Sequence, residues 1–425
     1  MEFTDSIRKV KESSFTAASL PEETRNSALA AVAGALEDRR EEIFAANGRD
    51  LVFAEETDLP EPIVKRLLFD DHKLEGCISG IRDLIGLEDP LFKTLLKRQL
   101  DDGLILTKTT CPIGVIGVIF ESRPDALVQI AALCIKSGNC VILKGGSEAR
   151  NSNRILFDII YDAALKAGMP ENFAFLIEDR TDIDQLLKCH DFVDLLIPRG
   201  SNQFVQYIMD NSKIPVMGHA DGICHVYVDS AASIEKAIPV IIDSKTQYVA
   251  ACNAAETLLV HRDIADALIP ALAKASGSSI KYRGDESCAS LISCEPATDE
   301  DFSTEYLDYI LSVKVVDSID EAVSHINRYG SHHTDCIITE DNAAADKFLS
   351  LVDSAGVYLN CSTRFADGFR YGFGAEVGIS TGKIHARGPV GLDGLVTYKY
   401  TLRGSGQIVA DYAEGRSSFK FRDLI

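Results

Sequence analysis

The sequence predicts an α/β protein with two doubly wound parallel-sheet domains and a small β element. Three observations lead to this prediction. The 425 residues are enough for two or three domains of ordinary size. Short apolar runs alternate with helical segments in two successive series, as in parallel strands joined by crossover helices. The chain is 46% hydrophobic and 25% charged, which is typical of folded globular proteins.

The first part of the chain, to about residue 95, is expected to be helical. Pro21-Glu22-Glu23 begins a helix, and Asn47-Gly48 is a plausible stop. Shorter helices are expected between residues 59 and 84. Two strand-like segments, 98–100 and 104–110, then flank Asp101-Asp102-Gly103, and Asp-Gly is a strong hairpin signal.

The first alternating series follows this hairpin. Residues 113–120 form a nearly continuous apolar run, as expected for a buried parallel strand. Further strands are expected at 140–143, 173–177, 194–197 and 225–228, with helices over 125–137 and 147–166 between them. We expect residues 1–243 to form one unit, a helical N-terminus followed by a Rossmann-like domain that carries the 98–111 hairpin.

The second series starts near residue 243. Its expected strands are 254–260, 311–316, 335–339 and 357–360, and its expected helices are 264–276, 319–329 and 342–351. We expect residues 244–375 to form this second domain and 376–425 to return to the first. The strand-like tail at 395–403 and the 98–111 hairpin are candidates for subunit contact, which predicts a homo-oligomer.

Charge and cysteine content exclude several classes of protein. With 43 Lys and Arg against 64 Asp and Glu, the net charge is −21, which argues against nucleic acid or anionic membranes as partners. No apolar stretch approaches the ~20 residues that a membrane span needs, and the N-terminus lacks the pattern of a signal peptide. The 11 cysteines include no C-x-x-C pair, which indicates free thiols in a reducing, cytoplasmic compartment and no zinc ribbon.

Cys252 stands out among the cysteines by its context. It lies in a run of small residues just before an apolar strand, where a substrate could reach the sulfur. A buried structural thiol is the alternative. Neither His332-His333 nor the group His219, Asp221, Cys224 and His225 shows metal-ligand spacing. We therefore expect structural hydrogen bonds there and no metal.

Two strand-to-helix turns have the composition of phosphate sites. The segments Lys144-Gly145-Gly146-Ser147 and Arg199-Gly200-Ser201 each follow a strand and open a helix, where backbone N–H groups attract anions. Neither is a Walker A loop or a G-x-G-x-x-G motif, so ordinary turns are the alternative.

Longer motifs resemble the γ-glutamyl phosphate reductases (glutamate-5-semialdehyde dehydrogenases), a branch of the aldehyde dehydrogenase superfamily. They occur in the family's order: CPIGVIGVIFESRP (111–124), ILKGGSEA (142–149), LIPRG (196–200), CHVYVD (224–229), KTQ (245–247), CNA (252–254), INRYGSHHTD (326–335), NCSTRFADG (360–368), GAEVGIST (374–381) and HARGP (385–389). The resemblance implies an aldehyde-dehydrogenase-like fold, with an NADP-binding first domain and a catalytic second domain. It implies NADPH-dependent reduction of L-γ-glutamyl 5-phosphate to L-glutamate 5-semialdehyde, the second step of proline biosynthesis from glutamate.

The resemblance also assigns catalytic residues. The Cys252 thiolate would attack the acyl phosphate and form a thioester. The oxyanion would bind the Cys252 backbone N–H and a second donor. Ser122 stands where the superfamily has an Asn, and Asn253 is a further candidate for that donor. The segment 216–222, which includes His219 and Ala220, lacks the glutamate that activates water in hydrolytic relatives. A phosphate-dependent enzyme needs no such water.

Cofactor and substrate residues follow in the same way. Lys144 matches the lysine that contacts the adenosine ribose, and Ser147 leaves room for a 2′-phosphate that Arg150 could assist, which favours NADP. Glu305 matches the glutamate that holds the nicotinamide ribose. The remaining candidates are Gly145, Gly200 and Ser201 for the cofactor and Arg123, Lys245 and Arg364 for the anionic substrate, with structural salt bridges as the alternative for the last three.

Two other functions remain open at this point. A hydrolytic or coenzyme-A-acylating aldehyde dehydrogenase would share the fold, and a non-catalytic chain would need no intact Cys252 context. The acyl phosphate must come from elsewhere. We expect a separate glutamate 5-kinase as its source, and this kinase is a candidate physical partner because acyl phosphates are labile.

Overall fold

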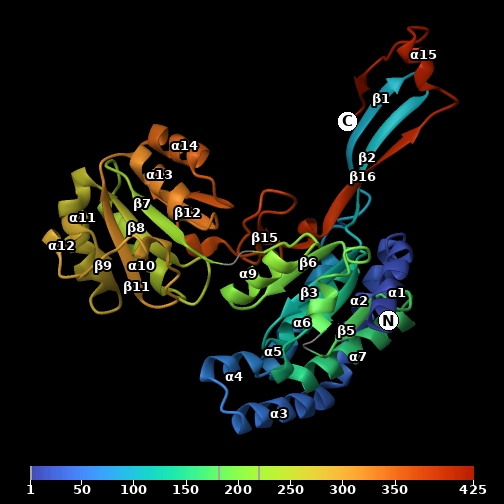
Figure 1. Cartoon of the computed structure of the whole chain (residues 1–425), viewed down its shortest axis with the longest axis horizontal. Helices are drawn as coiled ribbons and strands as arrows, with labels where there is room; N and C mark the ends of the chain where they lie inside the picture. Colours follow the sequence, from blue (N-terminus) through green and yellow to red (C-terminus); the bar gives the residue numbers. More distant parts are fainter. Residues whose placement is uncertain (1, 180–181, 219–220) are drawn as a thin grey trace.

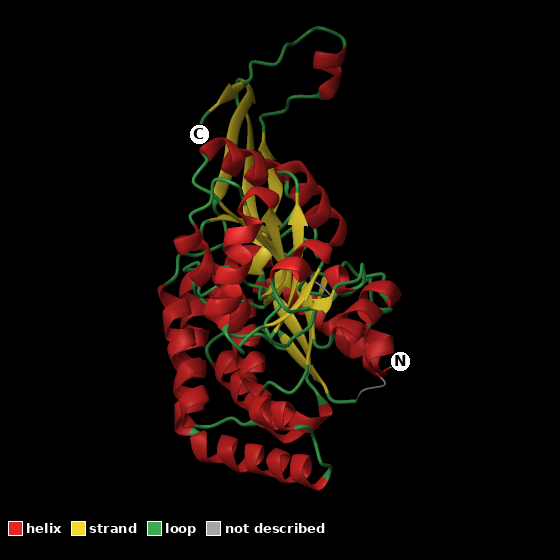
Figure 2. Ribbon diagram, turned by 90° about the vertical axis from the view of Figure 1, so that its left-hand side faces the viewer, coloured by secondary structure: helices red, strands yellow, loops and turns green. Residues whose placement is uncertain are grey.

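The computed structural model describes residues 2–179, 182–218 and 221–425. Two α/β domains lie side by side, and an arm of antiparallel strands projects away from them (Figure 1). Viewed from the side, the arm stands at one end of the molecule and the N-terminal helices α3 and α4 lie toward the other (Figure 2). None of the helices in this described part combines the length and apolarity that a membrane crossing needs.

The N-terminal region is helical, as predicted, with five helices in the described residues, but the expected stop at Asn47-Gly48 is wrong. The chain breaks at Arg39, and the next helix runs through both residues. Asn47 is buried, and its amide donates to Leu67 O (2.9 Å) and Ser152 Oγ (3.0 Å). Its side chain therefore serves tertiary contacts and does not end the helix. The helices are α1 (Glu2–Ala17), α2 (Glu22–Asp38), α3 (Arg40–Glu56), α4 (Glu61–Leu67) and α5 (Asp71–Gly86).

The first sheet has four parallel strands in the order β5-β4-β3-β6. Helices α6 and α7 pack on one face, and α1 and α8 pack on the other, so every residue of β3 is buried. The chain turns opposite ways after β3 and after β5, which places a topological switch point between β3 and β6. The elements are β3 (Val115–Phe120), α6 (Pro124–Lys136), β4 (Cys140–Lys144), η1 (Ser147–Ala149), α7 (Arg150–Lys166), β5 (Ala174–Ile177), α8 (Asp182–Leu186), β6 (Leu195–Arg199) and α9 (Asn202–Asn211).

The second sheet has seven parallel strands in the order β10-β9-β11-β8-β7-β12-β13. Successive side chains of β7 pack into two hydrophobic cores on opposite faces of the sheet. Val226 and Val228 belong to one core, and Tyr227 belongs to the other. Both predicted doubly wound domains are thereby confirmed. The elements are β7 (Cys224–Val228), α10 (Ile234–Thr246), β8 (Ala255–His261), α11 (Arg262–Ser276), β9 (Lys281–Gly284), α12 (Glu286–Leu291), β10 (Glu295–Pro296), η2 (Asp301–Ser303), β11 (Ile310–Val316), α13 (Ile319–Tyr329), β12 (Thr334–Ile338), α14 (Asn342–Leu351) and β13 (Gly356–Leu359).

The expected domain boundary at residue 243 assigns one strand to the wrong domain. We placed 225–228 in the first series, but β7 pairs with β8 and β12 in the middle of the second sheet. Its sequence is apolar on both faces, as in any buried parallel strand, so the local pattern could not say which sheet it joins. The chain therefore enters the second domain before residue 224.

The arm consists of the predicted hairpin and the C-terminal tail of the chain, which pair in one sheet. Strands β1 (Thr94–Asp101) and β2 (Leu104–Pro112) turn at Asp102-Gly103, with Gly103 at φ 69°, and β16 (Val396–Arg403) runs antiparallel along β2. β17 (Arg422–Asp423) pairs with β1, and α15 (Val409–Ala413) lies between β16 and β17. The arm exposes large apolar side chains, among them Leu95, Tyr398, Tyr400, Leu402, Phe419 and Phe421.

The segment before β16 returns to the first domain. Val377, Val390, Leu392 and Leu395 are buried in the core of that domain. The Asn139 amide donates to Leu395 O (2.8 Å) and fastens the segment there. The short strands β14 (Gly378–Ser380) and β15 (Gly388–Val390) and the 3₁₀ helix η4 (Leu392–Leu395) lie in this segment.

Candidate active site

Cys252 lies on the loop between α10 and β8, at the amino-terminal edge of the second sheet. His333 immediately precedes β12 at the same edge. Because β7 separates β8 from β12, both residues lie over the start of β7. His333 Nε2 is 3.2 Å from Cys252 Sγ. The sulfur is half-buried, while His333 is buried with Nδ1 2.9 Å from Thr334 Oγ1. The structure thus pairs the predicted nucleophile with an imidazole that can exchange a proton with it.

The Cys252 loop is held down by close backbone packing. A Cβ at Gly222 would lie 2.2 Å from Cys252 O and 2.4 Å from its Cα, so only glycine fits there. The Cys224 thiol donates to the same carbonyl at 3.3 Å. These contacts fix the position of Cys252 relative to the start of β7.

Asn253 tethers the other side of this loop. Its amide donates to Ala366 O (2.8 Å), and its own carbonyl accepts from Thr363 Oγ1 (2.7 Å) of η3 (Thr363–Phe365). The side chain is buried at 4% exposure. The structure therefore gives Asn253 a structural contact where we expected an oxyanion donor.

Ser122 is also engaged elsewhere. Its backbone N–H and its hydroxyl both donate to Glu148 Oε1, at 2.7 and 2.6 Å. Its φ of 43° is in the left-handed region, which is uncommon for serine. The hydroxyl proton is thus directed at Glu148, so the expectation that Ser122 donates to the oxyanion is not supported in this arrangement. The backbone N–H of Cys252 stays the candidate.

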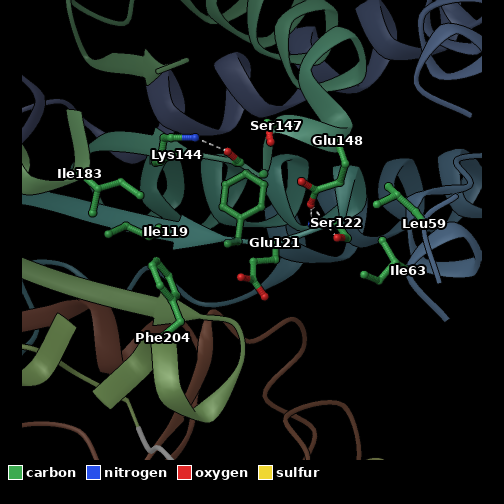
Figure 3. A pocket seen from close by; sticks show the side chains of 13 residues that line it. Leu59, Ile63, Ile119, Glu121, Ser122, Lys144, Ser147, Glu148, Ile183 and Phe204 are labelled. Carbon is green, nitrogen blue, oxygen red and sulfur yellow. Dashed lines mark hydrogen bonds between the residues drawn. The ribbon is translucent and has the colours of Figure 1, made fainter. Parts of the chain in front are cut away.

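Three predicted cofactor residues line one pocket at the carboxyl edge of the first sheet (Figure 3). Lys144, Gly145 and Ser147 lie there with Phe120 and Phe204, around a volume of about 240 Å³. Lys144 is buried and donates to Gly145 O at 2.6 Å. Arg150 is exposed, lies 3.7 Å from Glu178 and does not line the pocket.

The glycines of this turn leave no room for side chains. A Cβ at Gly145 would lie 2.1 Å from Asn153 Nδ2, and one at Gly146 would lie 2.0 Å from Glu148 Oε1. The turn links β4 to η1 and α7, as in anion-binding turns at helix starts. The lysine, the glycine turn and the pocket fit a dinucleotide.

The other predicted cofactor residues lie where the two domains meet. Ser201 precedes α9, and a Cβ on Gly200 would lie 3.0 Å from the Glu121 carboxyl group. Glu305, from the second domain, accepts from Asn202 Nδ2 at 2.7 Å. The carboxyl edge of the first sheet therefore faces the second domain.

Of the predicted substrate residues, Arg364 and Arg123 fit an anion site. Arg364 donates from Nε to Gln247 Oε1 (2.9 Å), and burial lowers its pKa, as does Arg370, while the nearby Cys252 raises it. The guanidinium is therefore within electrostatic range of the nucleophile. Arg123 is half-exposed and donates to Asp125 at 2.9 Å.

Lys245 does not face the site, and its assignment to the substrate is wrong. It is fully buried and forms a 2.6 Å ion pair with Glu256, which is also fully buried. Burial lowers the pKa of Lys245 and raises that of Glu256 to about 8, and each partner opposes the shift of the other. The pair is structural.

We expect Lys245→Met to destabilise the protein by about 3–5 kcal/mol, because it leaves the buried carboxyl group of Glu256 without its partner. The double variant Lys245→Met/Glu256→Leu should regain most of this loss, since both charges are then absent. Urea unfolding midpoints of the three proteins measure the effect. Unchanged stability together with a higher KM for the substrate would instead return Lys245 to the substrate site.

Sequence reasoning missed His333, which we interpreted as a loop residue. The available signal was positional, since His333 and Cys252 each stand just before a strand that proved to belong to one sheet. His219 and Ala220, in the segment that lacks a catalytic glutamate, lie outside the described residues. Within the ranges the structure describes, no group of three or more His, Cys, Asp and Glu could hold a metal ion.

Comparisons with known proteins agree with this geometry. Residues 2–288 match the model of the aldehyde dehydrogenase family. The chain is 58% identical to the γ-glutamyl phosphate reductase of Pelotomaculum thermopropionicum, over 100% of this chain and 98% of the relative. The corresponding protein of Acetivibrio thermocellus is also 58% identical, with 100% and 99% covered.

Solved structures show the same similarity. The chain superposes on γ-glutamyl phosphate reductase from Thermotoga maritima with a TM-score of 0.94, at 39% identity over 96% of this chain and 100% of the other. An acetylating aldehyde dehydrogenase from Geobacillus thermoglucosidasius gives a TM-score of 0.65 at 19% identity, covering 96% and 97% of the two chains. The second similarity shows a shared fold only.

Proposed function

The chain belongs to the γ-glutamyl phosphate reductase branch of the aldehyde dehydrogenase family, and we propose that it reduces L-γ-glutamyl 5-phosphate with NADPH. The products are L-glutamate 5-semialdehyde and phosphate, in the second step of proline biosynthesis from glutamate. The observation that carries the proposal is the pair of Cys252 and His333, 3.2 Å apart, on the loops that face the first domain.

Catalysis begins with formation of the thiolate. His333 Nε2 accepts the Cys252 proton, and the resulting imidazolium stays beside the sulfur. The thiolate attacks the carbonyl carbon of the acyl phosphate. A C–S bond forms, the C–O bond to phosphate breaks, and the acyl group remains on Cys252 as a thioester. The backbone N–H of Cys252 is the candidate donor to the oxyanion of this step.

NADPH, when bound, supplies the hydride that reduces the thioester to the level of the aldehyde. Lys144, Gly145 and Ser147 would hold its nucleotide half, and Glu305 would meet its nicotinamide ribose. Ser147 places no carboxylate at the ribose 2′ position, which favours a 2′-phosphate and hence NADP. When the aldehyde leaves, the C–S bond breaks and His333 can return its proton to the sulfur.

The substrate is anionic although the chain carries a net charge of −21. Arg364 and Arg199 each lie within electrostatic range of Cys252, with Arg370 near the first and Arg123 near the second. This local positive charge would attract an acyl phosphate in spite of the overall charge.

The reverse reaction tests the function. Purified protein with glutamate 5-semialdehyde should reduce NADP over many turnovers only when phosphate is added, and NAD should serve less well. Continued turnover without phosphate would indicate a hydrolytic dehydrogenase, and turnover that needs coenzyme A would indicate an acylating one. No reduction by folded protein with either cofactor would leave only the fold assignment.

We also propose that the arm joins copies of the chain. Its exposed apolar side chains, Tyr398, Tyr400 and Leu402 among them, form a surface suited to burial in an oligomer. Light scattering should give a mass at least twice the 46.3 kDa of one chain. A monomer at micromolar concentration would contradict this proposal.

A separate glutamate 5-kinase remains the proposed source of the acyl phosphate, and co-sedimentation of the two proteins would test their contact.

A further inference from the structure

Arg199 occupies the switch point of the first sheet. It is the last residue of β6 and lies beside Phe120, the last residue of β3. Crossovers leave these two neighbouring strands in opposite directions, and such a point opens a crevice at the carboxyl edge of the sheet. Arg199 belongs to the first domain, and its guanidinium lies within electrostatic range of Cys252 in the second domain.

One nitrogen of the Arg199 guanidinium has no hydrogen-bond partner among the described residues. This nitrogen, Nη1, is buried. Buried donors of a charged group are nearly always paired in native proteins, by protein, water or ligand. A guanidinium presents a planar fork of donors that matches the oxygens of a phosphate or carboxylate.

The charged groups around Arg199 favour binding of an anion at this position. Burial lowers the pKa of Arg199 and the nearby Arg123 lowers it further, while Glu376, Asp125 and Cys252 raise it. Asp125 Oδ2 accepts from Arg123, Asp125 Oδ1 is buried without a hydrogen bond among the described residues, and Glu376 accepts from the Gly368 N–H at 2.9 Å. Arg199 lies within electrostatic range of both Arg123 and Cys252.

We propose that Arg199 binds the phosphoryl group of the acyl phosphate, and in the reverse reaction the attacking phosphate. This inference rests on the proposed function. The phosphorus is joined through one oxygen to the carbon that Cys252 attacks, so the phosphoryl group must lie close to the sulfur. As the C–S bond forms and the C–O bond breaks, the electron pair of that bond goes to the phosphate. Arg199 stabilises this growing negative charge.

Two other anions are less well placed. The carboxylate of the substrate is at the opposite end of its carbon chain from the reacting carbon. The pyrophosphate of the cofactor belongs near the pocket of Lys144, Gly145 and Ser147, and Arg199 does not line that pocket. Electrostatic proximity to Cys252 therefore favours the phosphoryl group of the substrate.

The test separates phosphate binding from the other steps. In the reverse reaction, Arg199→Gln should raise the KM for phosphate roughly 10- to 100-fold, the effect of losing a hydrogen bond to a charged group. The burst of NADPH formed without phosphate should keep its amplitude, because it precedes attack by phosphate. The KM values for NADP and for the semialdehyde should stay within about threefold of wild type, since Arg199 would contact neither.

Two variants complete the design. Arg199→Lys should give a smaller rise, since lysine keeps the charge but loses the planar fork. Arg262→Gln is the matched control and should behave as wild type, because Arg262 is exposed and pairs with Asp317 on the surface. If Arg199→Gln does not fold, Arg199→Lys carries the test through its KM for phosphate.

Each alternative has its own outcome. An unchanged KM for phosphate in both Arg199 variants overturns the inference. A rise confined to the KM for NADP reassigns Arg199 to the cofactor pyrophosphate, and a rise confined to the semialdehyde reassigns it to the substrate carboxylate. A wild-type protein whose NADP reduction ignores phosphate would instead refute the proposed function itself.

Discussion

Replacing Cys252 by alanine is expected to lower the rate of phosphate-dependent NADP reduction by roughly 10⁴-fold or more. In the proposed mechanism the sulfur forms the bond to the acyl carbon, and the neighbouring thiol of Cys224 is fully buried. The loss should appear in kcat, and the single-turnover burst of NADPH should disappear with it. Stopped-flow absorbance of NADPH measures both quantities.

Cys111→Ala is the matched control for this experiment. Cys111 is half-buried like Cys252, but it lies in β2 of the arm, and burial raises the pKa of its thiol. Its removal should leave the rate and the burst unchanged. A Cys252→Ala protein that retained the burst would show that another group carries the acyl intermediate and would refute the thioester mechanism.

Replacing His333 by asparagine is expected to lower the rate by roughly 10²- to 10³-fold, the usual contribution of a positioned proton acceptor. The variant removes the imidazole that lies 3.2 Å from Cys252 Sγ and would accept its proton. Alkylation of Cys252 by iodoacetamide at neutral pH should slow as well, because only the thiolate reacts. This second measurement reports on the sulfur alone and does not depend on substrate or cofactor.

His332→Asn provides the comparison for His333. His332 is adjacent in sequence, but its Nδ1 lies 2.6 Å from Asp353 O rather than against the sulfur. Its φ of 61° suits asparagine, which tolerates the left-handed region. Equal alkylation rates in wild type and His333→Asn would show that the imidazole does not activate the thiol.

Most of the fold could be predicted from local pattern. Buried strands appear as short apolar runs, and the helices between them follow caps and breaks in that pattern, so α13 and α14 have the predicted bounds. The prediction failed where tertiary contacts override local preference. Asn47 resembles a helix stop, yet its amide is used between helices and α3 continues through it. The short elements β9, α12 and β10 carry too few residues for a pattern to be visible.

The sequence by itself determined the order of the longer elements and the family, and it led to the prediction that Cys252 is the nucleophile. These follow from neighbouring residues: apolar periodicity, turn chemistry, and long motifs that stay together along the chain. They required no knowledge of which strands become neighbours.

Only the tertiary structure decided which distant groups meet. His333 is 81 residues from Cys252, and the two come together because β7 brings β8 and β12 into one sheet. Lys245 has a basic side chain that could bind an anionic substrate, but in the fold it forms a buried ion pair with Glu256. Arg199 belongs to the other domain and lies within electrostatic range of Cys252. Contacts across a parallel sheet and between domains depend on strand order and packing, which no local stretch of sequence encodes.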